Sequence, residues 1–167
     1  MRHNLVILAF VLTAACTGGT APTAGGNEQA GNTAAAAPGV AAATPVEVVQ
    51  HHVDVMKAGD LDAIMSDYAD NTVVITPTGL VADQNPPTGP GVYSGLAEAR
   101  RVFSTLTNKD NIEAVKSMVT TIEPHGDDVA FLHWTQFKDT PKQVSGQDVF
   151  VVRDGKVVFQ DIIPDAK

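Results

Sequence analysis

The chain has a single cysteine, few aromatic residues and fewer basic than acidic side chains. One cysteine, Cys16, excludes an internal disulfide framework. The 11 lysines and arginines stand against 19 aspartates and glutamates, a formal net charge of -8. Nucleic acids and anionic membrane surfaces bind positive patches, so this balance argues against both as partners. No zinc-ligand spacing, nucleotide-phosphate loop or nucleophile elbow is present, so we expect no metal and no cofactor.

The N-terminal segment predicts export. In residues 1–15, a short basic start leads into an apolar run that is too short to span a bilayer but suits a signal peptide. Two alanines then precede Cys16, which resembles the lipobox of bacterial lipoproteins, although Thr13 stands where that motif usually has leucine. We expect Cys16 to be lipidated and the protein to be anchored in the bacterial cell envelope. Ordinary signal cleavage, which would give a secreted or periplasmic soluble protein, is the alternative.

A linker separates this anchor from the folded domain. Residues 16–44 consist almost wholly of Thr, Gly, Ala, Pro, Asn and Gln, with one charge, Glu28. Such a composition cannot bury enough apolar surface to offset the entropy of ordering, so we interpret it as a flexible tether. The domain is expected over residues 45–167.

Helical signals open the domain. A capping box at 44–47 with proline at the first helical position predicts a helix over 45–58, ended by Gly59. Asp60 is expected to cap a second, short helix that includes Tyr68. A turn at 70–71 and a strand over 73–76 should follow.

Further along the chain, a proline-rich loop is expected over 79–90, long enough to cover a pocket mouth. Ser94 should then cap a third helix, whose inner face is formed by Ala99, Val102, Phe103 and Leu106.

The remaining sequence predicts strands over 114–122, 129–137, 142–152 and 157–163, separated by turn residues. Such strands form an antiparallel meander. We therefore predict an α+β fold in which three N-terminal helices pack on one face of an antiparallel sheet.

Three segments carry a family resemblance: 58–77, 93–100 and 149–157. In this order they resemble the SnoaL-like branch of the nuclear transport factor 2-like superfamily. The resemblance implies a strongly curved, cone-shaped sheet with an internal apolar pocket, and a homodimer formed through the outer sheet face. The superfamily contains isomerases, cyclases, dehydratases, hydrolases and non-catalytic domains, so the fold alone does not define the function.

Two positions are compared with the ketosteroid isomerase branch. The residue before Pro77 is the proton-moving aspartate in that branch, but here it is Thr76, which cannot act as a general base near neutral pH. This substitution weakens the isomerase interpretation. His52 falls where that branch has its oxyanion-binding tyrosine, and it could donate a hydrogen bond or act as acid or base. A partly buried helix histidine bonded to a neighbour is the alternative.

Two further candidates lie on predicted strands. Asp148 falls near the second acid of the isomerase branch and alternates with Phe150, so it is either buried with a raised pKa or a rim aspartate. His133 alternates with Phe131, and it lines the pocket only if that face is the concave one. If it is not, Ala130, Leu132 and Trp134 line the pocket and His133 is exposed. The two phenylalanines that share a face with His133 slightly favour that face as the one that lines the pocket. A hydrogen-bonded His133–Asp148 pair across adjacent strands is the sharpest catalytic hypothesis.

Three functions remain open. The leading hypothesis is an envelope-anchored domain that binds a small, largely apolar molecule. The second is a cofactor-free acid–base enzyme, an isomerase, cyclase, dehydratase or hydrolase, that uses His133, Asp148 and His52. The third is a non-catalytic dimerisation or interaction module. The expected ligand-binding residues are Tyr68, Thr76, Val102, Phe103, Leu106, Phe131 and Phe150.

Overall fold

The computed structural model describes residues 42–84 and 88–166. Cys16, the predicted signal peptide and most of the predicted linker lie outside the described residues. Within the described part, no helix combines the length and the apolar character needed to cross a membrane.

Two helices begin the domain as the sequence predicts. Helix α1 (Pro45–Ala58) has a complete capping box between Thr44 and Glu47, and Gly59 ends it in the left-handed region at φ 76°. Helix α2 (Leu61–Ser66) is capped by Asp60, whose carboxylate accepts a hydrogen bond from the Ala63 N–H. The buried residues of α1 are Val48, Val49, His52, Val53 and Met56.

The first strand is longer than predicted. Strand β1 (Tyr68–Thr76) includes Tyr68, which was expected on the second helix, and the expected turn at Asp70–Asn71. The prediction of that turn is wrong because β1 stays extended while its pairing register with β6 (Lys156–Pro164) shifts between Tyr68 and Val73. The two polar residues are exposed within this irregular stretch of strand.

The end of the predicted loop contains a second strand, β2 (Gly91–Ser94), which pairs antiparallel with β1. Helix α3 (Leu96–Leu106) follows it, and its N-cap is Gly95 at φ 84° rather than Ser94. The expected Ser94 cap is wrong because Ser94 completes β2 and the next N–H, that of Gly95, donates to the Thr72 carbonyl.

A fourth helix, α4 (Ile112–Lys116), replaces the beginning of the strand predicted over 114–122. The Asn108 side-chain oxygen accepts hydrogen bonds from the N–H groups of Asp110 and Asn111, which turns the chain into this helix. Strand β3 (Val119–His125) therefore begins later than predicted and extends through Pro124.

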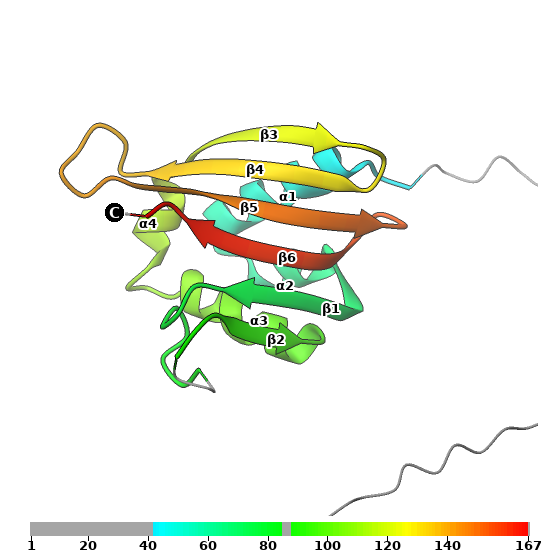
Figure 1. The fold of residues 1–167 in the computed structure, drawn as a ribbon, viewed down its shortest axis with the longest axis horizontal. Coiled ribbons are helices and arrows are strands. Elements are labelled where there is room, and N and C mark those ends of the chain that lie inside the picture. Colours follow the sequence, from blue (N-terminus) through cyan, green and yellow to red (C-terminus); the bar gives the residue numbers. More distant parts are fainter. Residues whose placement is uncertain (1–41, 85–87, 167) are drawn as a thin grey trace, which may run out of the picture. The chain divides into compact units, whose positions relative to one another are not determined.

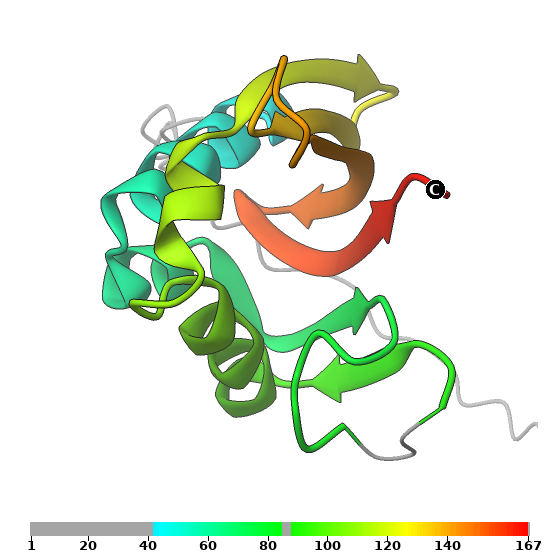
Figure 2. The same ribbon diagram turned by 90° about the vertical axis from the view of Figure 1, so that its left-hand side faces the viewer.

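The described strands form one six-stranded sheet in the order β2-β1-β6-β5-β4-β3. The predicted meander is confirmed, because β3, β4 (Val129–Gln136), β5 (Val144–Arg153) and β6 pair antiparallel in succession. Only the β1–β6 pairing among these neighbours is parallel. Figure 1 shows the strands in this order in front of the helices, and Figure 2 shows that the sheet is curved and does not close. The α+β class is confirmed, with the helices packed against the concave face.

Candidate functional site

A cavity of about 430 Å³ lies between the helices and the concave face of the sheet. Most of its wall is apolar, including Val53, Met56, Val115, Met118 and Ile162. A few polar side chains line it as well, namely His52, Asn111, Gln136, Asp148 and Gln160. A largely apolar cavity with a few converging polar groups is the usual form of a small-molecule site.

The loop after β1 contributes to this wall. Pro77, Gly79 and Leu80 line the cavity together with Asn111 before α4 and Pro164 at the end of β6. Figure 2 looks at this end of the sheet, where the loop, α4 and the end of β6 all lie. The part of the long loop that the structure describes therefore takes part in the site.

Asp148 is the central polar group. It lies on β5 between Leu132 of β4 and Ile162 of β6, and only 7% of its surface is exposed. Its Oδ1 accepts a hydrogen bond of 2.7 Å from the Trp134 indole N–H, and its Oδ2 accepts one of 2.8 Å from the Gln160 amide. Burial raises the pKa of Asp148 to about 7; these two hydrogen bonds oppose that rise, and the charge of nearby Asp161 adds to it.

Gly146 makes the Trp134 contact possible. It lies directly opposite Trp134 in the β4–β5 ladder. A Cβ atom at position 146 would lie 2.5 Å from Cζ2 of the indole and 2.5 Å from the Ile163 carbonyl oxygen. Only glycine leaves the indole room to lie where its N–H meets the carboxylate.

A chain of side chains links Asp148 to helix α1. The Tyr68 hydroxyl donates to Gln160 Oε1, and it lies 3.5 Å from Nδ1 of His52, the outer limit of a hydrogen bond. Burial raises the pKa of Tyr68 well above its ordinary value, so its hydroxyl stays protonated. The network thus runs from His52 through Tyr68 and Gln160 to Asp148.

His52 is buried among aromatic rings. Its imidazole makes edge contacts with Tyr68, Phe103 and Phe150 at centroid distances of 5.6, 5.3 and 5.4 Å. Burial first, and the neighbouring charge of His51 second, lower the pKa of His52 to about 3. The imidazole is therefore neutral near pH 7 and carries one N–H and one bare nitrogen.

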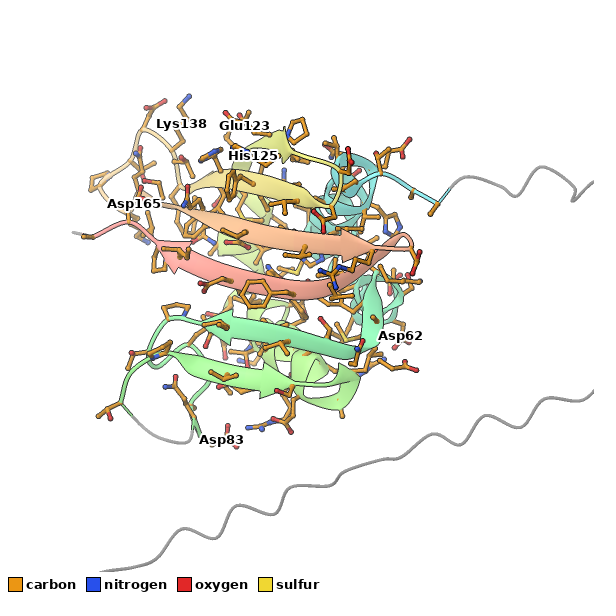
Figure 3. The ribbon with its side chains drawn as sticks, turned by 45° about the vertical axis from the view of Figure 1, so that its right-hand side comes forward. Asp62, Asp83, Glu123, His125, Lys138 and Asp165 are labelled. Atoms are coloured by element: carbon orange, nitrogen blue, oxygen red, sulfur yellow. The ribbon has the colours of Figure 1, made fainter. Side chains whose placement is uncertain are left out.

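The predicted His133–Asp148 pair is wrong. In the β4–β5 ladder Asp148 is opposite Leu132, and His133 is opposite Gln147. Because side chains alternate along a strand, His133 projects from the outer face, where its Nε2 lies 3.7 Å from Glu123. Figure 3 labels Glu123 and His125 on β3, the strand at the edge of the sheet next to β4.

The expectation that the face of β4 that carries His133 is the concave one is also wrong. Phe131 also lies on the outer face, and its ring contacts His125 at 4.7 Å, so it is not part of the cavity. Leu132 and Trp134 line the cavity instead.

The other predicted ligand-binding residues fall into two groups. Phe103 and Leu106 line the cavity. Tyr68, Thr76, Val102 and Phe150 are buried without lining it. Tyr68 and Phe150 nevertheless contact His52. The Thr76 hydroxyl has no hydrogen-bond partner among the residues the structure describes, and it lies beside Gly91 of β2 rather than beside the carboxylate.

Sequence reasoning missed Gln160 as a member of the site. Its only signal was an amide within the mainly apolar strand 157–163, where Phe159 precedes it and Asp161 follows it. Trp134 was considered only as part of the alternative face.

Over residues 42–84 and 88–166, no three His, Cys, Asp or Glu side chains converge as metal ligands would.

The two buried titratable groups predict opposing effects of pH on stability. Asp148 holds its proton in the folded state from its ordinary pKa of 3.8 up to about 7, so its contribution to stability falls as pH rises through that range. His52 stays unprotonated in the folded state from pH 6.5 down to about 3, so its contribution falls as pH drops.

Substitution of either group should remove the contribution of that group to the pH dependence of stability. Relative to the unsubstituted protein, Asp148→Asn should gain stability as pH rises from about 4 to 7, by roughly 1 kcal/mol per pH unit. His52→Phe should instead gain relative stability as pH falls from about 6.5. Urea unfolding over a pH series measures both slopes. Differences that do not change with pH would contradict the burial of these two groups.

The fold of this chain is similar to that of several solved structures. An NTF-2 like protein of unknown function from Burkholderia xenovorans LB400 aligns with a TM-score of 0.54 at 17% identity, over 73% of this chain and 83% of that chain. A protein from Kribbella flavida DSM 17836 aligns with a TM-score of 0.55 at 15% identity, over 75% and 87%. A de novo designed protein with a curved β-sheet aligns with a TM-score of 0.54 at 15% identity, over 72% and 84%.

These similarities show the fold alone, because a shared fold does not define a function and one of the three proteins was designed de novo. Comparison with curated proteins finds no significant match. The model of the SnoaL-like domain matches residues 49–160, which is more than half of the chain. This protein therefore belongs to the SnoaL-like domain family.

Proposed function

We propose that the domain binds a small, largely apolar molecule that carries one polar group. The observation that supports this proposal best is a cavity of about 430 Å³ whose mainly apolar wall holds one buried carboxyl group, that of Asp148. The apolar wall favours a hydrophobic body. Each oxygen of an ionised carboxylate accepts more than one hydrogen bond, so Asp148 can accept a further one from a ligand hydroxyl while Trp134 and Gln160 hold it in place.

A pair of probes tests this proposal. Naphthalene has the apolar body alone, and 2-naphthol adds one hydroxyl. The protein should bind 2-naphthol more tightly, and Asp148→Asn should remove about tenfold of affinity for 2-naphthol, equivalent to ~1.4 kcal/mol, with little effect on naphthalene. Titration followed by the fluorescence of the probes measures both affinities.

A second variant tests the cavity itself. Ala114 lines the cavity from α4, and Ala114→Phe should fill it and weaken both probes. Ala97→Phe, at an exposed position of α3, is the matched control and should change neither affinity. If the two variants bind the probes equally well, the ligand does not occupy this cavity.

The raised pKa of Asp148 favours acid–base catalysis as a second candidate function. Its carboxylate would take a proton from the carbon beside a ligand carbonyl, and the electron pair of the broken C–H bond would form the enolate. Return of a proton to carbon completes the cycle. Thr76 occupies the position of the aspartate in the isomerase branch, so Asp148 is the base available to this site.

Deuterium exchange tests this second candidate. In D₂O the protein should speed the exchange of the hydrogens beside the carbonyl of 1-tetralone. The rate should rise with pH through about 7 and level off above it as Asp148 becomes fully ionised. Asp148→Asn should lower the rate by on the order of 100-fold. Asp165→Asn, at an exposed carboxylate after β6, should leave it unchanged. Equal rates in Asp148→Asn and the unsubstituted protein would exclude Asp148 as the base.

We also propose that the protein is exported and lipid-anchored through Cys16, on the support of the N-terminal sequence. Mass spectrometry of the mature protein from bacterial membranes should find Cys16 as the first residue, with a diacylglyceryl group on its sulfur. Cys16→Ser should leave the protein outside the membrane fraction or unprocessed. A mature chain that begins elsewhere, or an unmodified Cys16, would contradict the anchor.

A further inference from the structure

The hydrogen bonds of the buried network all run in one direction. Tyr68 donates to the oxygen of the Gln160 amide, and the nitrogen of the same amide donates to Asp148. Because the Tyr68 proton is used toward Gln160, His52 Nδ1 can contribute only as a donor to the tyrosine oxygen. This direction matches an ionised Asp148, which can only accept.

When Asp148 is protonated, the hydrogen bonds of the network must run in the opposite direction. A carboxylic acid proton on the oxygen facing Gln160 meets an amide N–H, which cannot accept it. Rotation of the amide by 180° would bring Oε1 to Asp148 and Nε2 to Tyr68. The hydroxyl would then turn its own proton toward His52 Nδ1, which must be bare to accept it. In each of these two arrangements, every hydrogen bond between neighbouring members of the network joins one donor to one acceptor.

We propose that Gln160 is a positioning residue that couples the protonation of Asp148 to the tautomer of His52 through rotation of its amide. With Asp148 ionised, His52 carries its proton on Nδ1 and its Nε2 is bare. With Asp148 protonated, His52 carries its proton on Nε2. The network gains one proton in total, at Asp148, while the imidazole releases the Nδ1 proton and takes one at Nε2 by exchange with solvent.

The surroundings of the network keep His52 neutral in both states. Tyr68 of β1, Phe103 of α3 and Phe150 of β5 enclose the ring. On α1, His51 lies next to it in sequence and is paired with Asp67 at 2.7 Å.

Around Asp148, the ionisable neighbours are Tyr68 and Asp161, and Trp134 and Gln160 supply the hydrogen bonds. The proton uptake that drives the switch therefore occurs at Asp148.

The coupling would set the chemical class of the ligand. His52 lines the cavity, and its Nε2 has no hydrogen-bond partner among the described residues. In the ionised state the cavity offers two acceptors, Asp148 and His52 Nε2, which suits a ligand hydroxyl. In the protonated state His52 offers an N–H, which suits a ligand carbonyl.

NMR of the full chain labelled with ¹⁵N and ¹³C, without ligand, tests the proposal. The two ring nitrogens of a neutral imidazole have separate shifts that show which one is protonated. As pH falls through about 7, the protonated and bare nitrogens of His52 should exchange places, with the midpoint at which the Asp148 carboxyl carbon titrates. The ring should stay singly protonated throughout this range.

Variants separate coupling from packing. Gln160→Met keeps the approximate size but removes the amide, so Asp148 should still titrate while the His52 tautomer loses its pH dependence. Gln147→Met, on the outer face of β5, is the matched control and should keep it. In Asp148→Asn the His52 tautomer should not change near pH 7.

Three results would overturn the proposal. They are a His52 tautomer that stays constant while Asp148 titrates, a tautomer change that persists in Gln160→Met, and a doubly protonated His52 near pH 7. If Gln160→Met does not fold, the unsubstituted protein and Asp148→Asn still decide. The inference concerns the cavity of the proposed function, but the test uses no ligand, so a failure to bind the naphthalene probes leaves it intact.

Discussion

The burial of the Asp148 carboxyl group is the constraint on which the rest of the site depends. A carboxylate away from water is costly unless donors surround it, and here both donors, Trp134 and Gln160, are neutral. Neutral donors stabilise the ion less than a cation would, so the group keeps a pKa of about 7 and can change its charge near neutral pH. An arginine or lysine in place of Gln160 would hold Asp148 permanently ionised.

The residues that form hydrogen bonds with Asp148 require particular features elsewhere in the fold. Gly146 is required because the indole of Trp134 occupies the space of a side chain. Tyr68 donates a hydrogen bond to the amide of Gln160, and it can do so because β1 continues back to Tyr68 along β6 instead of turning at Asp70. The parallel β1–β6 pairing thus joins the helical layer to the polar centre of the cavity.

Helix α1 separates its two adjacent histidines into different environments. His51 faces outward and pairs with Asp67, whereas His52 faces the cavity among aromatic rings. The two adjacent positions thus supply one half-exposed imidazole that is hydrogen-bonded to a carboxylate and one buried neutral imidazole. The difference comes from the helical rotation between neighbouring residues and not from the residue type.

The sequence by itself determined the elements with local signals. The capping box, Gly59, the turn residues between the predicted strands and the alternation along those strands each depend on neighbours in the chain, and they predicted most of the α+β fold. Tertiary structure alone decided β2 and the extension of β1, because long-range pairing and packing override weak local preferences.

The same distinction between local signals and long-range contacts explains which parts of the site the sequence predicted. Alternation along β4 and β5 defined two faces and predicted that Asp148 lies with Phe150, but it did not say which face of β4 the sheet would curve around. His133 was therefore paired wrongly with Asp148. The contact of Asp148 with Gln160 depends on the register of β5 against β6, and that of Gln160 with Tyr68 on the crossover to β1. Such contacts join residues far apart in the chain, so only the folded sheet brings them within hydrogen-bond distance.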